Sequence, residues 1–108
     1  MPELNRVSLE ALETLGKNIE IARCRRQLSR KLLAERAMIT EQTYRRLAKG
    51  DGGVSLAVVL SVCQAMDIES LLSNMVNPEL DEVGKAQEEI TRQRTFRGNP
   101  DHAINTNF

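Results

Sequence analysis

Aromatic residues are unusually scarce in this chain of 108 residues. It has no tryptophan, one tyrosine and two phenylalanines, both near the C-terminal end. A hydrophobic core must therefore be built from leucine, isoleucine, valine, alanine and methionine, a composition typical of a small helical bundle. The length allows one modest core but not two.

The scarcity of cysteine and histidine excludes several kinds of site. Cys24 and Cys63 lie in separate helical segments and are too few for a disulfide framework, so both are expected to be free thiols in a reducing cytosol. The single histidine, His102, stands in a polar tail, so no metal site is expected. No nucleophile–base pair or pair of carboxylates suggests catalysis, so we predict neither a cofactor nor an enzymatic activity.

Long hydrophobic runs are also absent. No apolar stretch approaches the roughly 18 residues that a membrane span needs. No basic start followed by an apolar stretch indicates a signal peptide. We therefore expect a cytoplasmic protein with no membrane partner.

A net charge of zero conceals a strong separation of charge along the chain. Leu15 to Gly50 contains ten basic and three acidic side chains, a net charge of +7. Asp51 to Thr91 contains one basic and eight acidic side chains, a net charge of −7. A basic half can bind a polyanion, whereas an acidic half is repelled by one. The pattern favours nucleic acid as a partner.

The spacing of apolar residues predicts an all-α fold of five short helices. Ser29, Thr40 and Ser55 are the predicted N-caps of the second, third and fourth helices, and Gly50 is the predicted stop of the third. Gly16 interrupts the first pattern, so the residues before it could form a separate turn. The predicted helices cover residues 8–28, 29–37, 40–49, 55–66 and 68–76, followed by a polar helix within 78–94.

The second and third predicted helices meet the demands of a helix-turn-helix. In that motif two short helices pack at a steep angle, and one face of the second enters the major groove of DNA. Ala34 supplies the small residue where the helices cross. Ile39, Tyr44 and Leu47 supply the apolar residues of the turn and of the second helix.

The remaining face of the third helix is polar, has few charge pairs that would stabilise a solvated helix, and is expected to contact DNA. Gln42 and Arg46 are the predicted base readers, because glutamine suits adenine and arginine suits guanine. Glu41 fits two roles, compensation of the helix dipole or acceptance of a hydrogen bond from cytosine. The glycines after the helix lack the Lys-Ser/Thr pair and preceding strand of a phosphate loop, and are interpreted as a helix stop and a tight turn. The predicted DNA-contacting residues are Arg30, Thr40, Glu41, Gln42, Thr43, Arg45, Arg46, Lys49 and Lys17, of which Lys17, Arg30 and Lys49 are expected to contact the phosphate backbone.

From Leu15 to Leu72 the sequence resembles the Xre/lambda-repressor-type five-helix domain. The resemblance rests on the Leu-Gly start, Arg23, "LS" before the second helix, "LAERA", the ending "RRLAKG" and "SLAVVLSVCQAM". It implies a lambda-repressor-like helix-turn-helix domain that binds a palindromic DNA operator as a homodimer. The sequence departs from the family pattern at three positions: Met38 replaces the usual turn glycine, Arg30 the usual glutamine, and Tyr44 the usual isoleucine or valine.

A narrower resemblance connects "YRRLAKGDGGVSLAVVLSVCQAM" and "ELDEVGKAQ" to HipB-type antitoxins, the DNA-binding partners of HipA-type serine/threonine kinase toxins. It implies a nucleoid-associated bacterial homodimer that represses its own operon and holds the toxin in a complex. Two alternatives stay open. The main role could be to bind and restrain the kinase through the acidic half and the tail, or the chain could be a stand-alone Xre-type regulator with no toxin.

The sequence thus predicts four segments. These are an N-terminal arm or helical extension (1–14), the helix-turn-helix domain (15–77), a C-terminal helical extension (78–94) and a flexible tail (95–108). Because the first four helices already supply a core, the apolar residues that follow are predicted to form a two-fold dimer interface. These residues are Leu71, Leu72, Met75 and Val76.

Overall fold

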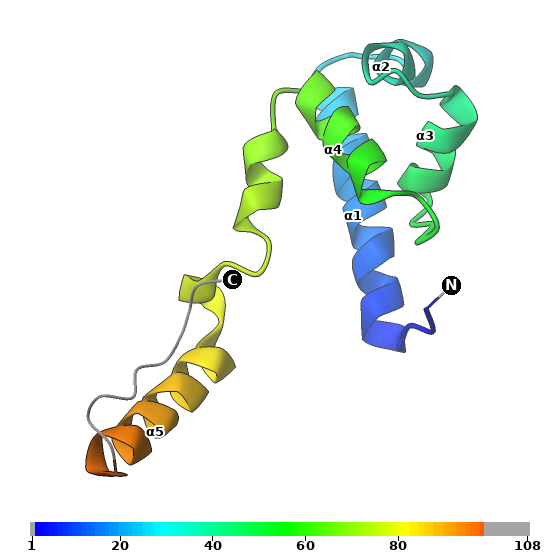
Figure 1. Ribbon diagram of the computed structural model, residues 1–108. Helices are drawn as coiled ribbons and strands as arrows, with labels where there is room; N and C mark the ends of the chain where they lie inside the picture. The colour runs from blue at the N-terminus through cyan, green and yellow to red at the C-terminus, as the bar shows by residue number, and fades with distance from the viewer. Residues whose placement is uncertain (1, 99–108) are drawn as a thin grey trace. The chain divides into compact units, whose positions relative to one another are not determined.

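The computed structural model describes residues 2–98, and these residues form helices joined by short loops (Figure 1). No strand occurs within this range, so the all-α prediction is confirmed. The predicted fifth helix is a 3₁₀ helix instead of an α-helix. The elements are α1 (Arg6–Arg25), α2 (Arg30–Arg36), α3 (Glu41–Ala48), α4 (Leu56–Ala65), the 3₁₀ helices η1 (Glu69–Asn74) and η2 (Pro78–Leu80), and α5 (Glu82–Gly98).

The chain divides into two compact units. The first covers Met1–Leu72 and contains α1 to α4, and the second begins at Ser73 and contains α5. Helix α5 continues to Gly98 and so includes the first four residues of the predicted tail, 95–108. The rest of the tail, residues 99–108, lies outside the described residues.

Side-chain caps fix where the helices of the first unit begin. Ser29 Oγ accepts a hydrogen bond from the backbone N–H of Leu32 at 3.0 Å, and Thr40 Oγ1 accepts one from Thr43 at 3.1 Å. Ser55 caps α4 in the same way. These caps satisfy backbone donors that the first turn of a helix leaves unpaired. All three predicted N-caps are confirmed.

Helix α1 starts earlier than predicted and is continuous. Asn5 caps it by accepting a hydrogen bond from the N–H of Ser8 at 2.9 Å. Gly16 lies within the helix and does not separate an initial turn. A Cβ at Gly16 would lie 2.4 Å from the carbonyl oxygen of Ala48, which is closer than real Cβ contacts allow. The glycine therefore lets α1 approach the end of α3.

The hydrophobic core of the first unit is aliphatic except for one tyrosine. Tyr44, Leu33 and Val62 are its largest fully buried side chains, and Ala34 on α2 is also buried. Helix α3 packs against both α1 and α2, and α2 also packs against α4. The remaining buried residues are Ile19, Ala37, Leu47, Val59, Cys63 and Met66. One aliphatic cluster thus holds the four helices together.

The turn between α2 and α3 keeps a left-handed backbone although it lacks glycine. Met38 has a φ of 60°, and its side chain is exposed. Its N–H donates to the carbonyl of Glu35, and the N–H of Ile39 donates to the carbonyl of Ala34 at 3.0 Å, which ends α2. A non-glycine residue in this conformation costs about 1–3 kcal/mol. The turn therefore keeps its left-handed backbone without glycine, and Met38 is strained.

The second unit, from Ser73 onward, contains η2 and α5. Asp81 Oδ1 accepts a hydrogen bond from the N–H of Gly84 at 2.9 Å near the start of α5. Along α5, Arg92 forms ion pairs with Glu88 and Glu89. The described side chains of this helix include none that are buried. Across residues 2–98, no helix is long and apolar enough to cross a membrane, and no cluster of side chains could hold a metal ion.

Candidate nucleic-acid interface

Helix α3 has one face in the core and one face in solvent. Tyr44 and Leu47 are buried, and Ile39, just before the helix, packs against the same core. Gln42, Arg45 and Arg46 are exposed, and Glu41 and Thr43 are half-buried. The predicted anchors are therefore confirmed, and the polar residues between them face away from the core.

The carboxylate of Glu20, on α1, connects all three elements of this region. The hydroxyl of Tyr44, on α3, donates a hydrogen bond to Glu20 Oε1. Arg30, at the start of α2, donates from Nη2 to Oε2 at 3.0 Å, and Arg23 donates from Nε and Nη2 to the two oxygens. The hydroxyl of Tyr44 thus has an internal partner, which explains how the larger side chain is accommodated.

These contacts change the acidity of the groups involved. The hydrogen bond from Arg23, together with those from Tyr44 and Arg30, outweighs burial and lowers the pKa of Glu20 to about 2. Burial and the neighbouring carboxylate raise the pKa of the Tyr44 phenol well above its usual range. Glu20 is therefore ionised and Tyr44 neutral at physiological pH. Glu20 was not among the predicted site residues; its only sequence signal is its spacing of three residues from Arg23.

Arg23 and Arg30 are held differently although both bind Glu20. The Arg23 side chain is mostly buried, and its Nη1 also donates to the carbonyl of Leu28 at 2.7 Å. This bond ties the end of α1 to the loop that leads into α2. The Arg30 side chain is 48% exposed, so it is oriented by Glu20 and still open to solvent. Arg30 can therefore meet an external anion.

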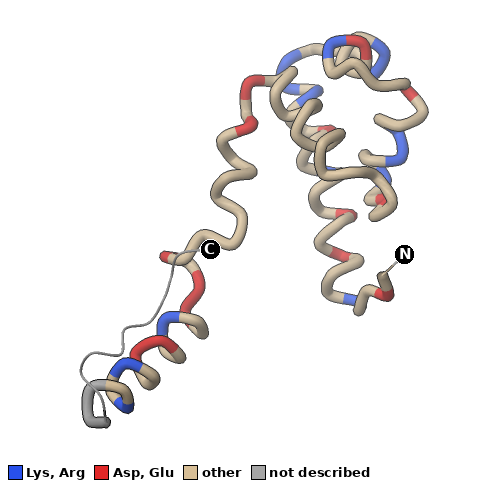
Figure 2. The backbone as a smooth tube through the Cα atoms, in the orientation of Figure 1, with Lys and Arg blue, Asp and Glu red and all other residues tan. Residues whose placement is uncertain are grey.

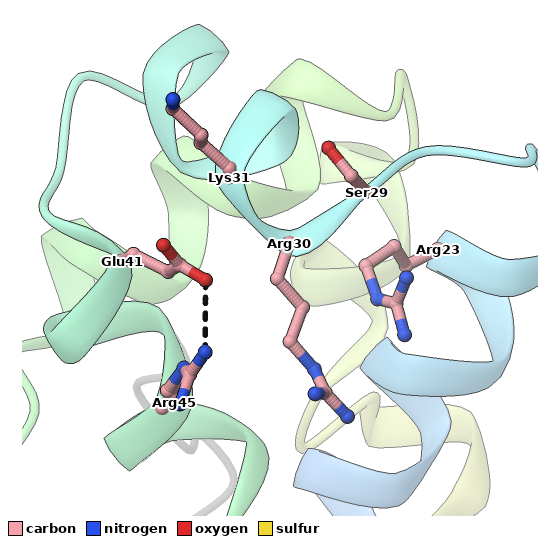
Figure 3. A pocket seen from close by; sticks show the side chains of 6 residues that line it. All are labelled: Arg23, Ser29, Arg30, Lys31, Glu41 and Arg45. Carbon is pink, nitrogen blue, oxygen red and sulfur yellow. Dashed lines mark hydrogen bonds and ion pairs between the residues drawn. The ribbon is translucent and has the colours of Figure 1, made fainter.

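A shallow basic hollow lies where α2 and α3 begin (Figure 3). Its volume is about 360 Å³, and a second hollow of about 230 Å³ adjoins Glu20 and the end of α3. Arg30 and Arg45 line both hollows. Figure 2 shows Lys and Arg gathered on α2, on α3 and on the adjoining end of α1. The first hollow is lined by Arg23, Ser29, Arg30, Lys31, Glu41 and Arg45.

Two ion pairs involve the arginines of α3, one within the helix and one to the loop that follows it. Arg45 Nη2 lies 3.0 Å from Glu41 Oε1, one helical turn away. Arg46 Nε donates to Asp51 Oδ2 at 2.7 Å. The Arg46 guanidinium, with help from the N–H of Gly53, lowers the pKa of Asp51. The second pair was missed because the loop was interpreted only as a helix stop.

A comparison with protein families finds a match to the family described as helix-turn-helix over residues 19–72, half of the chain. The chain belongs to the helix-turn-helix family. A comparison with curated proteins finds no match. The matched family, of the Xre/lambda-repressor type, consists of DNA-binding regulatory domains that are not enzymes. This protein is therefore a DNA-binding transcriptional regulator.

In this helix-turn-helix, α2 and α3 are the two helices of the motif and α3 is the recognition helix. The structure gathers Thr40, Gln42, Thr43 and Arg46 on α3 or at its start. Thr40 acts as the N-cap and also donates its hydroxyl to Thr43 Oγ1 at 2.8 Å. Lys17 on α1 and Lys49 at the end of α3 are exposed. Their roles towards DNA stay predictions.

The four residues predicted to form a dimer interface have different environments. Leu71, Met75 and Val76 are exposed, with 62% of Leu71 and 88% of Val76 open to solvent. Leu72 is half-buried and packs against the core of the helix-turn-helix unit. The first four helices thus leave part of that core open, and Leu72 covers it. The dimer interface itself stays a prediction.

Proposed function

We propose that the protein is a sequence-specific repressor that binds a palindromic operator as a homodimer. The observation that carries this proposal is α3, whose buried Tyr44 and Leu47 hold a polar face outward. On this face Gln42 and Arg46 would read base edges in the major groove. In a dimer, two such helices about 34 Å apart would read successive major grooves.

The basic surface around α3 supports a role in holding the DNA backbone. Arg30 and Arg45 line both hollows, and Lys49 lines the second. Contacts from these residues and from Lys17 would set the position of the protein without reading sequence. Arg30 is the strongest of these assignments, because Glu20 orients its guanidinium while much of the side chain stays exposed.

The repressor role is tested by selecting DNA from a random library with the full chain. We expect enrichment of a palindrome whose half-sites are centred about one helical turn, 10–10.5 bp, or a multiple of it apart. Footprinting should protect two adjacent major grooves on one face of the duplex. Recovery of no common sequence would contradict a sequence-specific repressor, even if the chain bound DNA.

The finer role we propose is that of an autoregulating, HipB-like antitoxin with a HipA-type kinase partner. Its support is the sequence resemblance, together with the acidic segment from Asp51 to Thr91, which extends into the second unit that begins at Ser73. A surface of this charge is unsuited to DNA and suits a protein partner. Such a regulator would act in the bacterial cytoplasm, at the nucleoid.

A pull-down from native cells tests this finer role. We expect a kinase encoded beside the gene, and DNA from upstream of the gene, to co-purify. Recovery of the DNA without a kinase would favour a stand-alone regulator. Arg46→Ala then separates two routes of toxin control. If this variant still neutralises the toxin, the protein restrains the kinase directly. If it no longer neutralises the toxin, control acts through transcription.

A further inference from the structure

The side chain of Arg46 is held by the loop that follows its own helix. Gly50, with a φ of 84°, ends α3 in the left-handed conformation. The N–H of Asp51 then donates to the carbonyl of Arg46 at 3.0 Å, which closes the helix end. This backbone bond brings the Asp51 side chain close to that of Arg46. The local backbone thus sets the position of the carboxylate.

Both carboxylate oxygens of Asp51 have a defined partner. Oδ1 accepts from the N–H of Gly53 at 2.7 Å, and Oδ2 accepts from Nε of Arg46 at 2.7 Å. The first bond fixes the carboxylate on the loop, so the second fixes the guanidinium relative to α3. Asp51 is thereby a rigid support for a long and otherwise flexible side chain.

The bond to Asp51 uses only the Nε nitrogen of the guanidinium. Among the described residues, neither terminal nitrogen of Arg46 has a hydrogen-bond partner, and the side chain is 47% exposed. The two terminal nitrogens form the fork that suits O6 and N7 of guanine. A fork held in advance loses less side-chain entropy on binding. The negative charge of Asp51 also disfavours approach to a phosphate, which directs Arg46 towards bases.

We infer that Asp51 is a positioning residue that orients Arg46 for the recognition of guanine and thereby sets the base specificity of the helix-turn-helix. This inference rests on the proposed function, in which Arg46 reads a base. It assigns a role to the loop that goes beyond ending the helix. Asp51 thus contributes to base preference through the orientation of Arg46.

The test uses the full chain and two duplexes. One carries a sequence selected from random DNA by the wild-type protein, and the other has the guanine assigned to Arg46 replaced by adenine. Asp51→Asn is the informative variant, because the amide oxygen can still accept from Gly53 while the amide nitrogen cannot accept from Arg46. Asp67→Asn is the charge-matched control, since Asp67 is exposed and its φ of 61° is tolerated by asparagine.

We expect Arg46→Ala to reduce the preference for guanine by about tenfold or more. Asp51→Asn should reduce it by about three- to tenfold, with an unchanged melting temperature, and Asp67→Asn should leave it unchanged. In the Arg46→Ala background, Asp51→Asn should have no further effect on the preference. This dependence on Arg46 distinguishes orientation of the reader from a general effect of charge.

Three outcomes would overturn the inference. If Asp51→Asn keeps the full guanine preference while Arg46→Ala loses it, Arg46 reads the base without support, and the proposed function stands. If Asp51→Asn changes the affinity for both duplexes equally, its carboxylate acts only through charge. If Arg46→Ala keeps the guanine preference, the assignment of Arg46 as a reader fails and the role of Asp51 fails with it.

Discussion

The hydroxyl of Tyr44 on α3 donates a hydrogen bond to the carboxylate of Glu20 on α1. The ring of Tyr44 is fully buried, and the carboxylate also binds Arg23 and Arg30. One ionised group therefore joins the recognition helix, the start of α2 and the long first helix. The orientation of α3 depends on this polar junction as well as on the aliphatic core.

Replacing Tyr44 by phenylalanine tests this junction with the smallest change in shape. The ring stays buried, whereas the hydrogen bond to an ionised carboxylate is lost, so unfolding should become easier by about 1–3 kcal/mol. Urea denaturation measures the change. If Tyr44→Phe is as stable as wild type, the hydroxyl contributes nothing to the stability of the fold.

The stability of the protein should depend on pH through Glu20. Its pKa is lowered from 4.5 to about 2 in the fold, mainly by hydrogen bonds from Arg23, Tyr44 and Arg30. The stabilisation is therefore present above pH 4.5 and is lost as the pH falls towards 2. Because the side chain is partly open to solvent, we expect about 1–3 kcal/mol.

Glu20→Gln is the control for this pH dependence. The variant should be less stable than wild type at pH 7, and the difference should shrink between pH 4.5 and 2. Denaturation at several pH values measures both proteins. Parallel curves over this range would mean that Glu20 titrates normally in the folded protein.

Local features of the fold were predictable from the sequence, and contacts between distant residues were not. Ser29 and Thr40 could be identified as caps because each bonds to the N–H three residues later. Glu20 was missed because its partners Arg30 and Tyr44 lie 10 and 24 residues away. Only folding brings these groups together, and no periodic pattern in the sequence indicates that they are in contact.

The loop after α3 shows a different limit to prediction from the sequence. Its glycines identified the helix end correctly, because Gly50 adopts the left-handed conformation expected of a C-terminal stop. The pairing of Asp51 with Arg46 depends on that same conformation and was not foreseen. Leu72 was assigned to a dimer interface because the core seemed complete, whereas the gap it fills is visible only once the helices are packed.

Gly16→Ala should destabilise the first unit although alanine favours helices. A Cβ at this position would lie 2.4 Å from the carbonyl oxygen of Ala48 and 2.8 Å from its carbonyl carbon, both backbone atoms. We expect a net loss of about 1–3 kcal/mol, because the clash outweighs the helix propensity gained. Chemical denaturation measures it.

Gly52→Ala is the matched control for Gly16→Ala. A Cβ there would lie 3.0 Å from the end of the Leu12 side chain, which can rotate away more easily than backbone can move. The loss of stability should therefore be smaller than for Gly16→Ala. Equal losses would indicate that α1 and α3 can separate slightly without cost.

Arg30→Ala should weaken DNA binding without changing sequence preference. If Arg30 contacts a phosphate, affinity should fall by a similar factor on selected and unrelated duplexes, and the salt dependence should decrease by about one ion. Fluorescence anisotropy over a range of salt concentrations measures both effects. Arg6→Ala is the control, since Arg6 lies at the start of α1 and its side chain is 91% exposed.

The predicted dimer interface can be tested by comparing two adjacent leucines. Leu71 is exposed, whereas Leu72 packs against the core, so a serine at each position has a different expected effect. Leu71→Ser should shift the dimer towards monomer in sedimentation experiments and leave the unfolding of the monomer nearly unchanged. Leu72→Ser should instead lower the free energy of unfolding of the monomer by about 2 kcal/mol. Burial of an exposed leucine stabilises an interface through the apolar area removed from water. If Leu71→Ser remains as dimeric as wild type, Leu71 is therefore not part of the interface, and another surface holds the two copies together.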